Sequence, residues 1–310
     1  LRSAVVDFCA ANWLVFTPPL TAGDVAGVIA DINETGYGLT FGLHTRIDGR
    51  VQDVVDTAAV GNLYINRNQI GAVVGSQPFG GQGLSGTGPK AGGPFYLERF
   101  RQRPLAAAAS PPDTANTVPE AEVAAALAAL DMGAWAARRD QVSTLRDALR
   151  GRARTAMSAA AALDMGPIDL PGPTGESNRL WLAPRGRVLC LGPSADALLD
   201  QAVQALRAGN GVVAVAPDAM AAVRILIDAG LPLFAANGGL DPAALARLQV
   251  DAVASEGGGA ALRQALAARA GARIPLIARR IDCISYAHER VLCIDTTAAG
   301  GNASLLAMAG

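Results

Sequence analysis

Residues 188–216 read VLCLGPSADALLDQAVQALRAGNGVVAVA, and this stretch decides the fold of the second part of the chain. Aliphatic residues run over 188–191, a Gly-Pro-Ser turn occupies 192–194, and apolar residues follow at helical spacing over 195–208. A second aliphatic run covers 212–216. Two short apolar strands joined by a helix are typical of a parallel βαβ unit. The stretch therefore predicts the first two strands of a parallel sheet.

The same alternation continues toward the C-terminus. Further strands are expected at 231–235, 252–255 and 274–278, and further helices at 219–229 and 260–270. Strands that alternate with helices of ten to fifteen residues favour an α/β fold with crossover helices. We therefore expect a Rossmann-like domain over about 180–280.

The preceding residues predict a more mixed set of elements. The apolar spacing predicts a helix over 21–35, capped by Asp24 and stopped by Gly36. The other elements expected before residue 180 are strands at 39–44, 63–66 and 72–74, an edge strand at 96–100, helices at 46–59, 120–130 and 141–165, and a loop at 166–177. Glycine and proline crowd residues 75–94, which excludes regular structure there.

Composition changes sharply along the chain. The 310 residues are 51% hydrophobic with a formal net charge of -1, which argues against disorder and against a basic nucleic-acid surface. Alanine occurs 10 times in residues 1–100 and 54 times in residues 101–310, so the second part should be helix-rich. Pro, Ser and Asp residues at 104–119 indicate a linker.

The location expected from composition is cytoplasmic. Four cysteines lack CxxC spacing and there are only two histidines, so neither a zinc cluster nor a disulfide framework is expected. No run of 18 apolar residues occurs, so no transmembrane helix is expected. The chain begins with Leu1 in mid-pattern, and we interpret it as a piece of a longer protein.

Two glycine-bearing turns could contact a nucleotide, and neither has the full pattern. Residues 81–86, GQGLSG, match GxGxxG but are embedded in loop sequence, whereas a dinucleotide fingerprint needs a strand before it and a helix within it. We expect a structured, close-packed loop there instead. The turn at Gly192 is followed by Pro193, which lacks an amide donor, so the cradle for a pyrophosphate would be incomplete. Nucleotide binding by 180–280 stays open as a lesser alternative.

Single reactive residues give no catalytic constellation. Cys9 has apolar neighbours and no adjacent base, and Cys190 lies inside an aliphatic strand, so both favour buried thiols. His44 and His288 have no partner nearby in sequence, so both are expected to be structural or exposed. No metal site is expected.

Residues 61–94, GNLYINRNQIGAVVGSQPFGGQGLSGTGPKAGGP, resemble the end of the catalytic domain of glutamate-semialdehyde (1-pyrroline-5-carboxylate) dehydrogenases in the aldehyde dehydrogenase superfamily. Residues 34–48, ETGYGLTFGLHTRID, resemble the same region, and residues 289–306, ERVLCIDTTAAGGNASLL, resemble the C-terminal end of the long bifunctional proline utilization A family. The resemblance is specific because the two regions, 34–94 and 289–306, occur in the right order and far apart in the chain.

The resemblance implies NAD-dependent oxidation of glutamate semialdehyde to glutamate, as part of the conversion of proline to glutamate. It assigns Gly71 and Ala72 to a loop that anchors the α-carboxylate and amine of the substrate. It assigns Phe79 to an aromatic wall against the aliphatic part of the substrate. Amides beside a glycine can donate to a carboxylate, and an aromatic wall excludes water.

Residues 1–20 depart from the resemblance. The nucleophilic cysteine of the family is expected upstream of this chain, and the context of Cys9, DFCAANW, does not match it. The family's E-x-F-G-P motif, which meets the cofactor, should fall near residues 9–13, where this chain reads CAANW. We therefore expect no catalytic and no cofactor-binding residue in this chain, which should be inactive alone. FAD would belong only to the absent proline dehydrogenase region.

The resemblance, together with the change in alanine content, implies a domain scheme. Residues 1–103 would be the C-terminal part of the dehydrogenase catalytic domain, 104–119 a linker, 120–285 an Ala-rich and Rossmann-like non-catalytic domain that covers a substrate tunnel, and 286–310 a C-terminal docking motif. The expected partners are the substrate, the rest of the dehydrogenase domain and a further copy in a homo-oligomer, without nucleic acid. The alternative is an assembly or oligomerisation module of the same superfamily with no part in catalysis.

Overall fold

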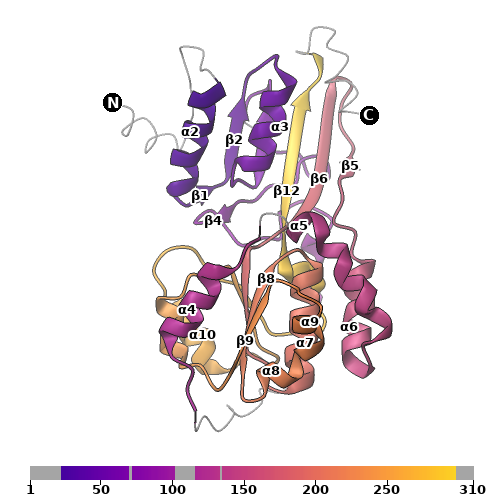
Figure 1. Ribbon diagram of the computed structural model, residues 1–310. Helices are drawn as coiled ribbons and strands as arrows, with labels where there is room; N and C mark the ends of the chain where they lie inside the picture. The colour runs from indigo at the N-terminus through magenta and orange to yellow at the C-terminus, as the bar shows by residue number, and fades with distance from the viewer. Residues whose placement is uncertain (1–21, 70–71, 102–115, 133–134, 298–310) are drawn as a thin grey trace. The chain divides into compact units, whose positions relative to one another are not determined.

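The computed structural model describes residues 22–69, 72–101, 116–132 and 135–297 (Figure 1). The chain divides into two compact units. Unit 1 contains Leu1–Arg101, Gly166–Leu182 and Glu289–Gly310, and unit 2 contains Gln102–Met165 and Ala183–His288.

Unit 2 is built on a five-stranded sheet whose paired strands are all parallel. Its strands, in chain order, are β7 (Arg187–Cys190), β8 (Gly211–Ala216), β9 (Leu233–Asn237), β10 (Ala252–Ala254) and β11 (Leu276–Ile277). In space they follow the order β11-β10-β7-β8-β9. The chain thus builds outward from β7 on one side and then returns to its other side, which is the strand order of a Rossmann-like fold. The predicted fold of this region is confirmed.

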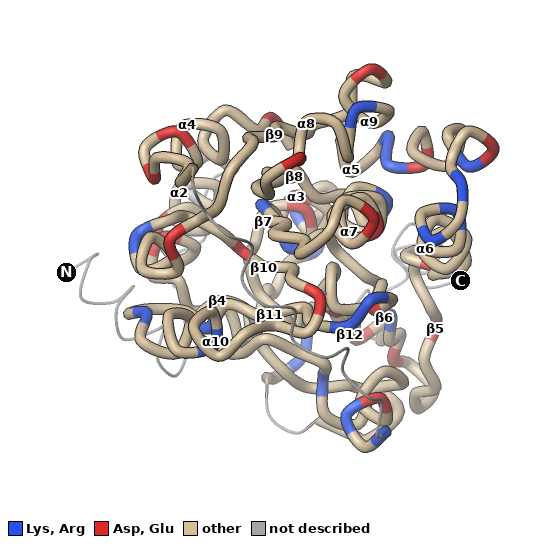
Figure 2. Tube along the Cα trace, turned by 90° about the horizontal axis from the view of Figure 1, so that it is seen from below, with Lys and Arg blue, Asp and Glu red and all other residues tan. Residues whose placement is uncertain are grey.

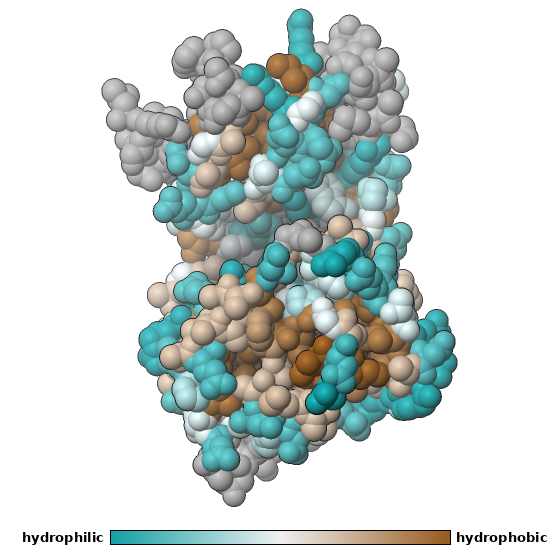
Figure 3. All heavy atoms as spheres, viewed as in Figure 1, coloured by the Kyte–Doolittle hydropathy of each residue, from teal (hydrophilic) through white to brown (hydrophobic). Residues whose placement is uncertain are grey.

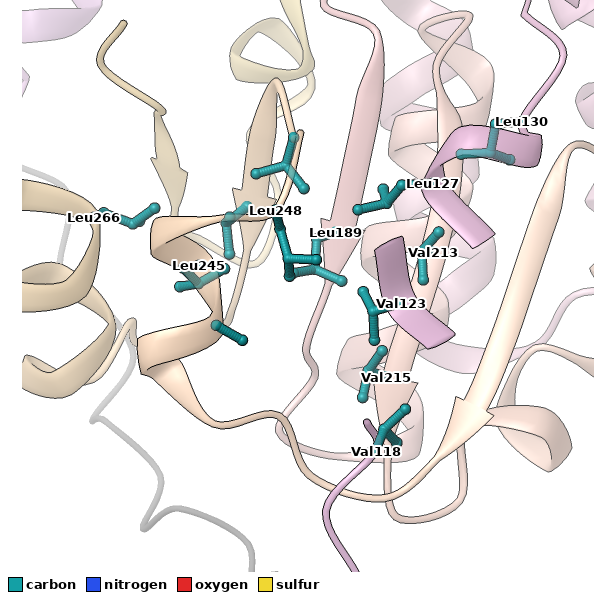
Figure 4. Packing of buried hydrophobic residues seen from close by; sticks show 13 residues of the cluster. Val118, Val123, Leu127, Leu130, Leu189, Val213, Val215, Leu245, Leu248 and Leu266 are labelled. Carbon is teal, nitrogen blue, oxygen red and sulfur yellow. The ribbon is translucent and has the colours of Figure 1, made fainter. Parts of the chain in front are cut away.

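Helices cover both faces of this sheet. One face packs on α4 (Glu120–Ala129) and α10 (Ala260–Ala267) through a cluster of buried aliphatic side chains (Figure 4). Leu189 and Val213 belong to that cluster. Their strand neighbours, which are also buried, point to the opposite face because strand side chains alternate. Helix α7 (Ala195–Arg207) packs against β7 and β8 there, and α6 (Gly151–Ala162) packs against α7.

The turn into α7 explains why this helix begins where the sequence predicts. Ser194 is its N-cap, and the hydroxyl oxygen of Ser194 accepts a hydrogen bond from the backbone N–H of Ala197 at 3.2 Å. Such a cap satisfies one of the amides that a helix start leaves without a partner. The remaining helices of unit 2 are α5 (Trp135–Arg138), η2 (Arg139–Asp147), α8 (Ala219–Ala222), α9 (Arg224–Asp228), η3 (Pro242–Ala246) and η4 (Cys283–Tyr286).

Unit 1 is built on a mixed five-stranded sheet that joins distant parts of the chain. Its strands are β2 (Thr40–Leu43), β3 (Asn62–Ile65), β5 (Ile168–Leu170), β6 (Glu176–Pro184) and β12 (Ala287–Asp295), in the spatial order β2-β3-β12-β6-β5. Strand β12 pairs in parallel with β3, with Cys293 opposite Tyr64. The C-terminal strand therefore lies at the centre of the sheet (Figure 1).

Two helices cover one face of the unit 1 sheet. They are α2 (Ala22–Glu34) and α3 (Asp48–Thr57), and their buried aliphatic residues pack on Leu63 and Ile65 of β3 and on Leu292 and Ile294 of β12. Side chains alternate along a strand, so Asn62, Tyr64 and Cys293 lie on the other face. Unlike the helix-covered face, this second face carries buried polar groups.

The remaining part of unit 1 is the glycine-rich loop, defined as residues 75–94. It contains β4 (Gln82–Gly83), which pairs with β1 (Tyr37–Gly38), and it leads into the 3-10 helix η1 (Tyr96–Phe100). Gly36 ends α2 with a φ of 74°, in the left-handed region that favours glycine, so the predicted helix stop is confirmed. Helix α2 begins at Ala22, before Asp24, so the predicted cap at Asp24 is wrong.

Several local predictions are wrong. Residues 96–100 form a 3-10 helix and not an edge strand, because the turn that begins at Pro94 continues into i-to-i+3 hydrogen bonds such as that from Glu98 N–H to Phe95 O. Residues 72–74 are not a strand. The loop expected at 166–177 contains β5 and the first residues of β6.

The helices expected at 141–165 and 219–229 are each divided into two. Gly151, with a φ of 50°, opens α6 after the 3-10 helix η2. The residue between α8 and α9 is Val223, whose ψ of 15° departs from α-helical geometry. The predicted domain boundaries at 103, 119 and 285 stay predictions about independently folding parts.

The surface carries charges of both signs. Figure 2 shows Lys and Arg intermixed with Asp and Glu in both units. Hydrophobic residues also reach the visible surface of unit 2 (Figure 3). Met220 and Phe234 of this unit are 52% and 42% exposed. No helix among the described residues is long and apolar enough to cross a membrane.

Candidate functional site

The glycine-rich loop folds back on itself around Phe79. Phe79 and Ala91 form an antiparallel bridge, in which each backbone N–H donates to the carbonyl oxygen of the other residue at 2.9 Å. The N–H of Gly75 donates to the carbonyl oxygen of Gly92 at 3.0 Å. The Phe79 side chain is half-buried. The loop thus holds an aromatic side chain on an ordered backbone frame and not on a free strand end.

A single buried amide holds the chain on both sides of Phe79. The Nδ2 group of Asn62 donates to the carbonyl oxygen of Pro78 at 2.8 Å, and the Oδ1 atom of Asn62 accepts from the backbone N–H of Gly80 at 3.2 Å. Asn62 is 0% exposed and lies at the start of β3. The strand therefore fixes the two residues that flank Phe79.

A buried lysine completes this arrangement. Nζ of Lys90 donates to Oδ1 of Asn62 at 2.8 Å and to the carbonyl oxygen of Gly80. The backbone N–H of Lys90 donates to Oε2 of Glu289, at the start of β12, at 2.5 Å. Burial lowers the pKa of Lys90 to about 7, although the Glu289 carboxylate opposes this shift.

The packing around this lysine leaves no room for a side chain at Gly61, directly before β3. A Cβ atom on Gly61 would overlap the carbonyl oxygen of Gly80 and would lie 2.7 Å from Nζ of Lys90. Gly61 is thus needed because the loop backbone approaches the strand closely. The same closeness lets Asn62 reach the loop.

A second buried polar cluster lies on the same face of the sheet. The Glu176 carboxylate of β6 accepts from Arg67 through Oε2 at 2.6 Å, and from Gln77 and Asn178 through Oε1 at 2.6 and 2.9 Å. Arg67 also donates to the sulfur of Cys293 at 2.9 Å. Glu176 therefore joins residues on both sides of the segment that contains Ala72.

The electrostatics of this second cluster exclude Cys293 as a ready nucleophile. Burial raises the pKa of Cys293 to about 12, although the Arg67 guanidinium opposes the shift. A thiol must lose its proton to attack an aldehyde carbon, and this one stays protonated at neutral pH. Cys293 is a structural thiol beside Tyr64 and Arg67.

Among the residues that the structure describes, the others singled out in the sequence are not brought together. Gly71 and Cys9 lie outside the described residues, Ala72 is exposed, and Phe79 lies in the loop as described above. Cys190 is buried in β7, where burial raises its pKa, and burial raises the pKa of Cys283 to about 11. His44 is exposed. Among the described residues, no group of three His, Cys, Asp or Glu side chains could hold a metal ion.

The GQGLSG segment has the structure expected for a packed loop. Gln82 and Gly83 pair with β1, and Ser85 accepts a hydrogen bond from the backbone N–H of Gly38 at 3.1 Å. No helix begins within the segment. It therefore lacks the helix N-terminus that binds a pyrophosphate.

At the position that would hold a nucleotide in unit 2, the backbone groups of Gly192 already bind other residues of the chain. A Rossmann-like sheet binds its ligand where the strand order reverses, between β7 and β10. There the N–H of Gly192 donates to Oε1 of Gln201 at 3.1 Å, and Nε2 of Gln201 donates back to Gly192 O at 2.7 Å. The N–H of Glu256 donates to Gly192 O at 2.9 Å.

Charge at the same position also disfavours a phosphate. The Glu256 carboxylate binds Arg152, and Arg152 also binds Asp200 at 3.0 Å. The charge of the Arg152 guanidinium is thus already balanced by two carboxylates. With Gly192 N–H occupied and Pro193 without an N–H, the described residues of unit 2 do not fit a dinucleotide.

Comparison with known proteins identifies the region that contains the loop. Residues 17–104 match the Aldehyde dehydrogenase family. The region that matches makes up less than a third of the chain. We call it the aldehyde dehydrogenase part, and it includes Asn62, Phe79 and Lys90 but neither Glu176 nor Glu289.

Relatives match beyond the aldehyde dehydrogenase part. The chain is 40% identical over 305 residues to the bifunctional protein PutA of Rhizobium meliloti, covering 92% of this chain and 23% of that protein. It is 38% identical over 323 residues to the bifunctional protein PutA of Escherichia coli, covering 97% and 23%. It is 47% identical over 76 residues to the 1-pyrroline-5-carboxylate dehydrogenase of Bacillus subtilis, covering 24% and 15%.

The chain spans less than a quarter of the length of these PutA relatives. Among solved structures, proline utilization A from Corynebacterium freiburgense is similar, with a TM-score of 0.49 and 20% identity, over 87% of this chain and 24% of that chain. The aldehyde dehydrogenase family in general uses a nicotinamide cofactor.

The polar groups around Phe79 were not found from the sequence. Asn62 had a usable signal, because it is a polar residue at the start of the otherwise apolar strand sequence NLYI. Lys90 and Glu289 had none, because they are 199 positions apart and meet only when β12 joins the sheet beside β3.

Proposed function

We propose that this chain is part of an NAD-dependent glutamate-semialdehyde (1-pyrroline-5-carboxylate) dehydrogenase of proline catabolism. The observation that carries the proposal is the 40% identity to the bifunctional protein PutA of Rhizobium meliloti over 92% of this chain. The relative that is named a 1-pyrroline-5-carboxylate dehydrogenase matches residues in one part of the chain only, which supports the dehydrogenase half of such a protein. The catalytic residues would come from sequence outside this chain.

In this proposal Phe79 provides an apolar surface for the methylene carbons of the substrate. Its ring is half-buried and its backbone is held by the bridge to Ala91, so it can present a fixed face. Burial of aliphatic carbons against such a ring removes apolar surface from water, which favours binding. The ring also helps keep water from a reactive aldehyde.

Gly71 and Ala72 would anchor the charged end of the substrate through backbone amides. Ala72 is exposed, and it is followed by Val73 and Val74, which are 55% and 84% exposed. An exposed segment leaves amides available to a carboxylate. The assignment of Gly71 and Ala72 stays a prediction.

NAD would be the hydride acceptor, and this chain would not hold it. The position in unit 2 where a dinucleotide would bind is occupied by Gln201, Glu256 and Arg152. In the proposed enzyme, unit 2 is therefore a non-catalytic domain. Its role as a cover over a substrate tunnel, and the homo-oligomer expected from the sequence, stay predictions.

The test is Phe79→Ala in the complete enzyme of which we propose this chain to be a part. Loss of the aromatic contact should cost about 2 kcal/mol of binding. This corresponds to a rise of about thirtyfold in KM for glutamate semialdehyde, with a much smaller change in KM for NAD. Steady-state kinetics with each substrate varied in turn measures both values.

Phe234→Ala is the matched control, because Phe234 is a phenylalanine of unit 2 that is 42% exposed. It should leave both KM values unchanged. An unchanged KM for the semialdehyde in folded Phe79→Ala enzyme would remove Phe79 from the site.

A further inference from the structure

Phe79 is held by three buried polar residues that come from three separate parts of unit 1. Asn62 lies on β3, Lys90 in the glycine-rich loop, and Glu289 on β12. Their exposed fractions are 0%, 2% and 6%. Burying an amide, an ammonium and a carboxylate costs free energy unless each is hydrogen-bonded. A structural role is therefore expected for this buried cluster.

The hydrogen bonds of the cluster are aimed at the backbone around Phe79. Asn62 binds Pro78 O at 2.8 Å and Gly80 N–H at 3.2 Å, which are the residues directly before and after Phe79. Lys90 Nζ binds Gly80 O as well as Asn62. Three polar contacts thus fix a tripeptide whose central side chain is the aromatic ring.

Glu289 holds the other strand of the bridge. It accepts the backbone N–H of Lys90 at 2.5 Å, and Lys90 directly precedes Ala91, the bridge partner of Phe79. Phe79 is therefore fixed from β3 on one side and from β12 on the other. Glu289 lies outside the region that matches the aldehyde dehydrogenase family.

We infer that Asn62, Lys90 and Glu289 are positioning residues that set the place of the Phe79 ring, and so set the affinity for the aliphatic part of the substrate. This inference rests on the proposed function for its effect on substrate binding. The effect on the loop itself does not depend on that function. A ring that contacts the substrate has to be held within a narrow range of positions. The fixed backbone before and after Phe79 restricts the ring in this way.

The experiment uses Asn62→Asp, which keeps the shape and the acceptor but loses the donor to Pro78 O. Asn33→Asp is the matched control, because Asn33 likewise binds a carbonyl, Thr57 O, and an amide, Ala59 N–H, both at 2.8 Å, away from Phe79. A second variant, Glu289→Gln, removes the charge at the Lys90 amide. It keeps the inference testable if Asn62→Asp does not fold.

The first readout is amide hydrogen exchange at Phe79 and Ala91, measured in the 310-residue chain and in the complete enzyme. Loss of one buried hydrogen bond should speed exchange at these two amides by about tenfold in Asn62→Asp, and the Asn33→Asp control should leave them at the wild-type rate. Wild-type exchange at Phe79 and Ala91 in both folded variants would overturn the inference.

The second readout is kinetic and is made in the complete enzyme. Both variants should raise KM for the semialdehyde by about tenfold while kcat changes much less, because the ring contacts substrate and does not react. Faster exchange with an unchanged KM would uphold the positioning of the loop and overturn its effect on substrate affinity. If Phe79→Ala also left KM unchanged, the proposed role of Phe79 would be wrong, and the exchange result would still stand.

Discussion

Titration of the buried residue Lys90 makes the free energy of unfolding of this protein depend on pH. Burial lowers the pKa of Lys90 to about 7 in the folded chain, against a value of 10.5 when the residue is solvated. Between these values the unfolded chain binds the extra proton, so the free energy of unfolding should rise with pH. The contribution of this one group is at most about 1.4 kcal/mol per pH unit.

Replacement of Lys90 with methionine should remove this contribution. The variant loses the hydrogen bonds to Asn62 and Gly80, so it should be less stable at the upper end of the range. Its free energy of unfolding should also depend less on pH between about 7 and 10 than that of the wild type. Urea titrations at several pH values measure both, and equal slopes for the two proteins would contradict the pKa of Lys90.

A carboxylate of strand β6 binds two side chains of the aldehyde dehydrogenase part. Glu176 binds Arg67, Gln77 and Asn178, and the Glu176 and Arg67 side chains are 16% and 17% exposed. Glu176→Gln would leave the Arg67 guanidinium without its counter-charge in a partly buried position. We expect a loss of about 2 kcal/mol in the free energy of unfolding.

Asp169→Asn is the control for Glu176→Gln. Asp169 lies on β5, next to β6, and pairs with Arg179 at 3.2 Å, but its side chain is 73% exposed. An exposed pair contributes at most about 1 kcal/mol, so this variant should stay close to the wild type. Equal losses in the two variants would show that burial of the Glu176 pair adds no stability.

Predictability from sequence differed between the elements for physical reasons. Strands β7 and β8 are buried on both faces, so their aliphatic runs and the helix between them were predicted correctly. Strand β6 has buried residues alternating with half-buried ones, and it follows a segment rich in proline and glycine, so its start was taken for loop. The 3-10 helix η1 was taken for a strand because tyrosine and phenylalanine favour strands.

The candidate site was predictable only in part. Phe79 was found through the resemblance of its motif to a known family. Its supporting residues Asn62, Lys90 and Glu289 were not, because their meeting depends on the register between β3 and β12. Such long-range strand pairing leaves no local pattern in the sequence.

The folding of unit 1 depends on the C-terminal part of the chain. Strand β12 lies between β3 and β6 in the sheet, and its Leu292 and Ile294 belong to the core under α2 and α3. A chain that ends at residue 286 should therefore lose the cooperative unfolding transition of unit 1. The sheet of unit 2 lies before residue 286 and should keep its own transition.

Hydrogen exchange read separately on β3 and on β8 tests this expectation. In the shortened chain, amides of β3 should lose their protection while those of β8 retain it. A deletion of residues 298–310, which follow β12, serves as the control and should leave β3 protected. Protection of β3 without β12 would show that the remaining strands suffice.

The central place of β12 also determines the order of events during synthesis. The strands of unit 2 are all synthesised before β12, whereas β3 waits for its neighbour until translation has passed Asp295. Until then the edge of β3 that pairs with β12 has no partner strand. Of the two units, the one whose synthesis begins first is thus completed last. A translation that stops before β12 yields unit 2 attached to an open sheet edge, which favours aggregation.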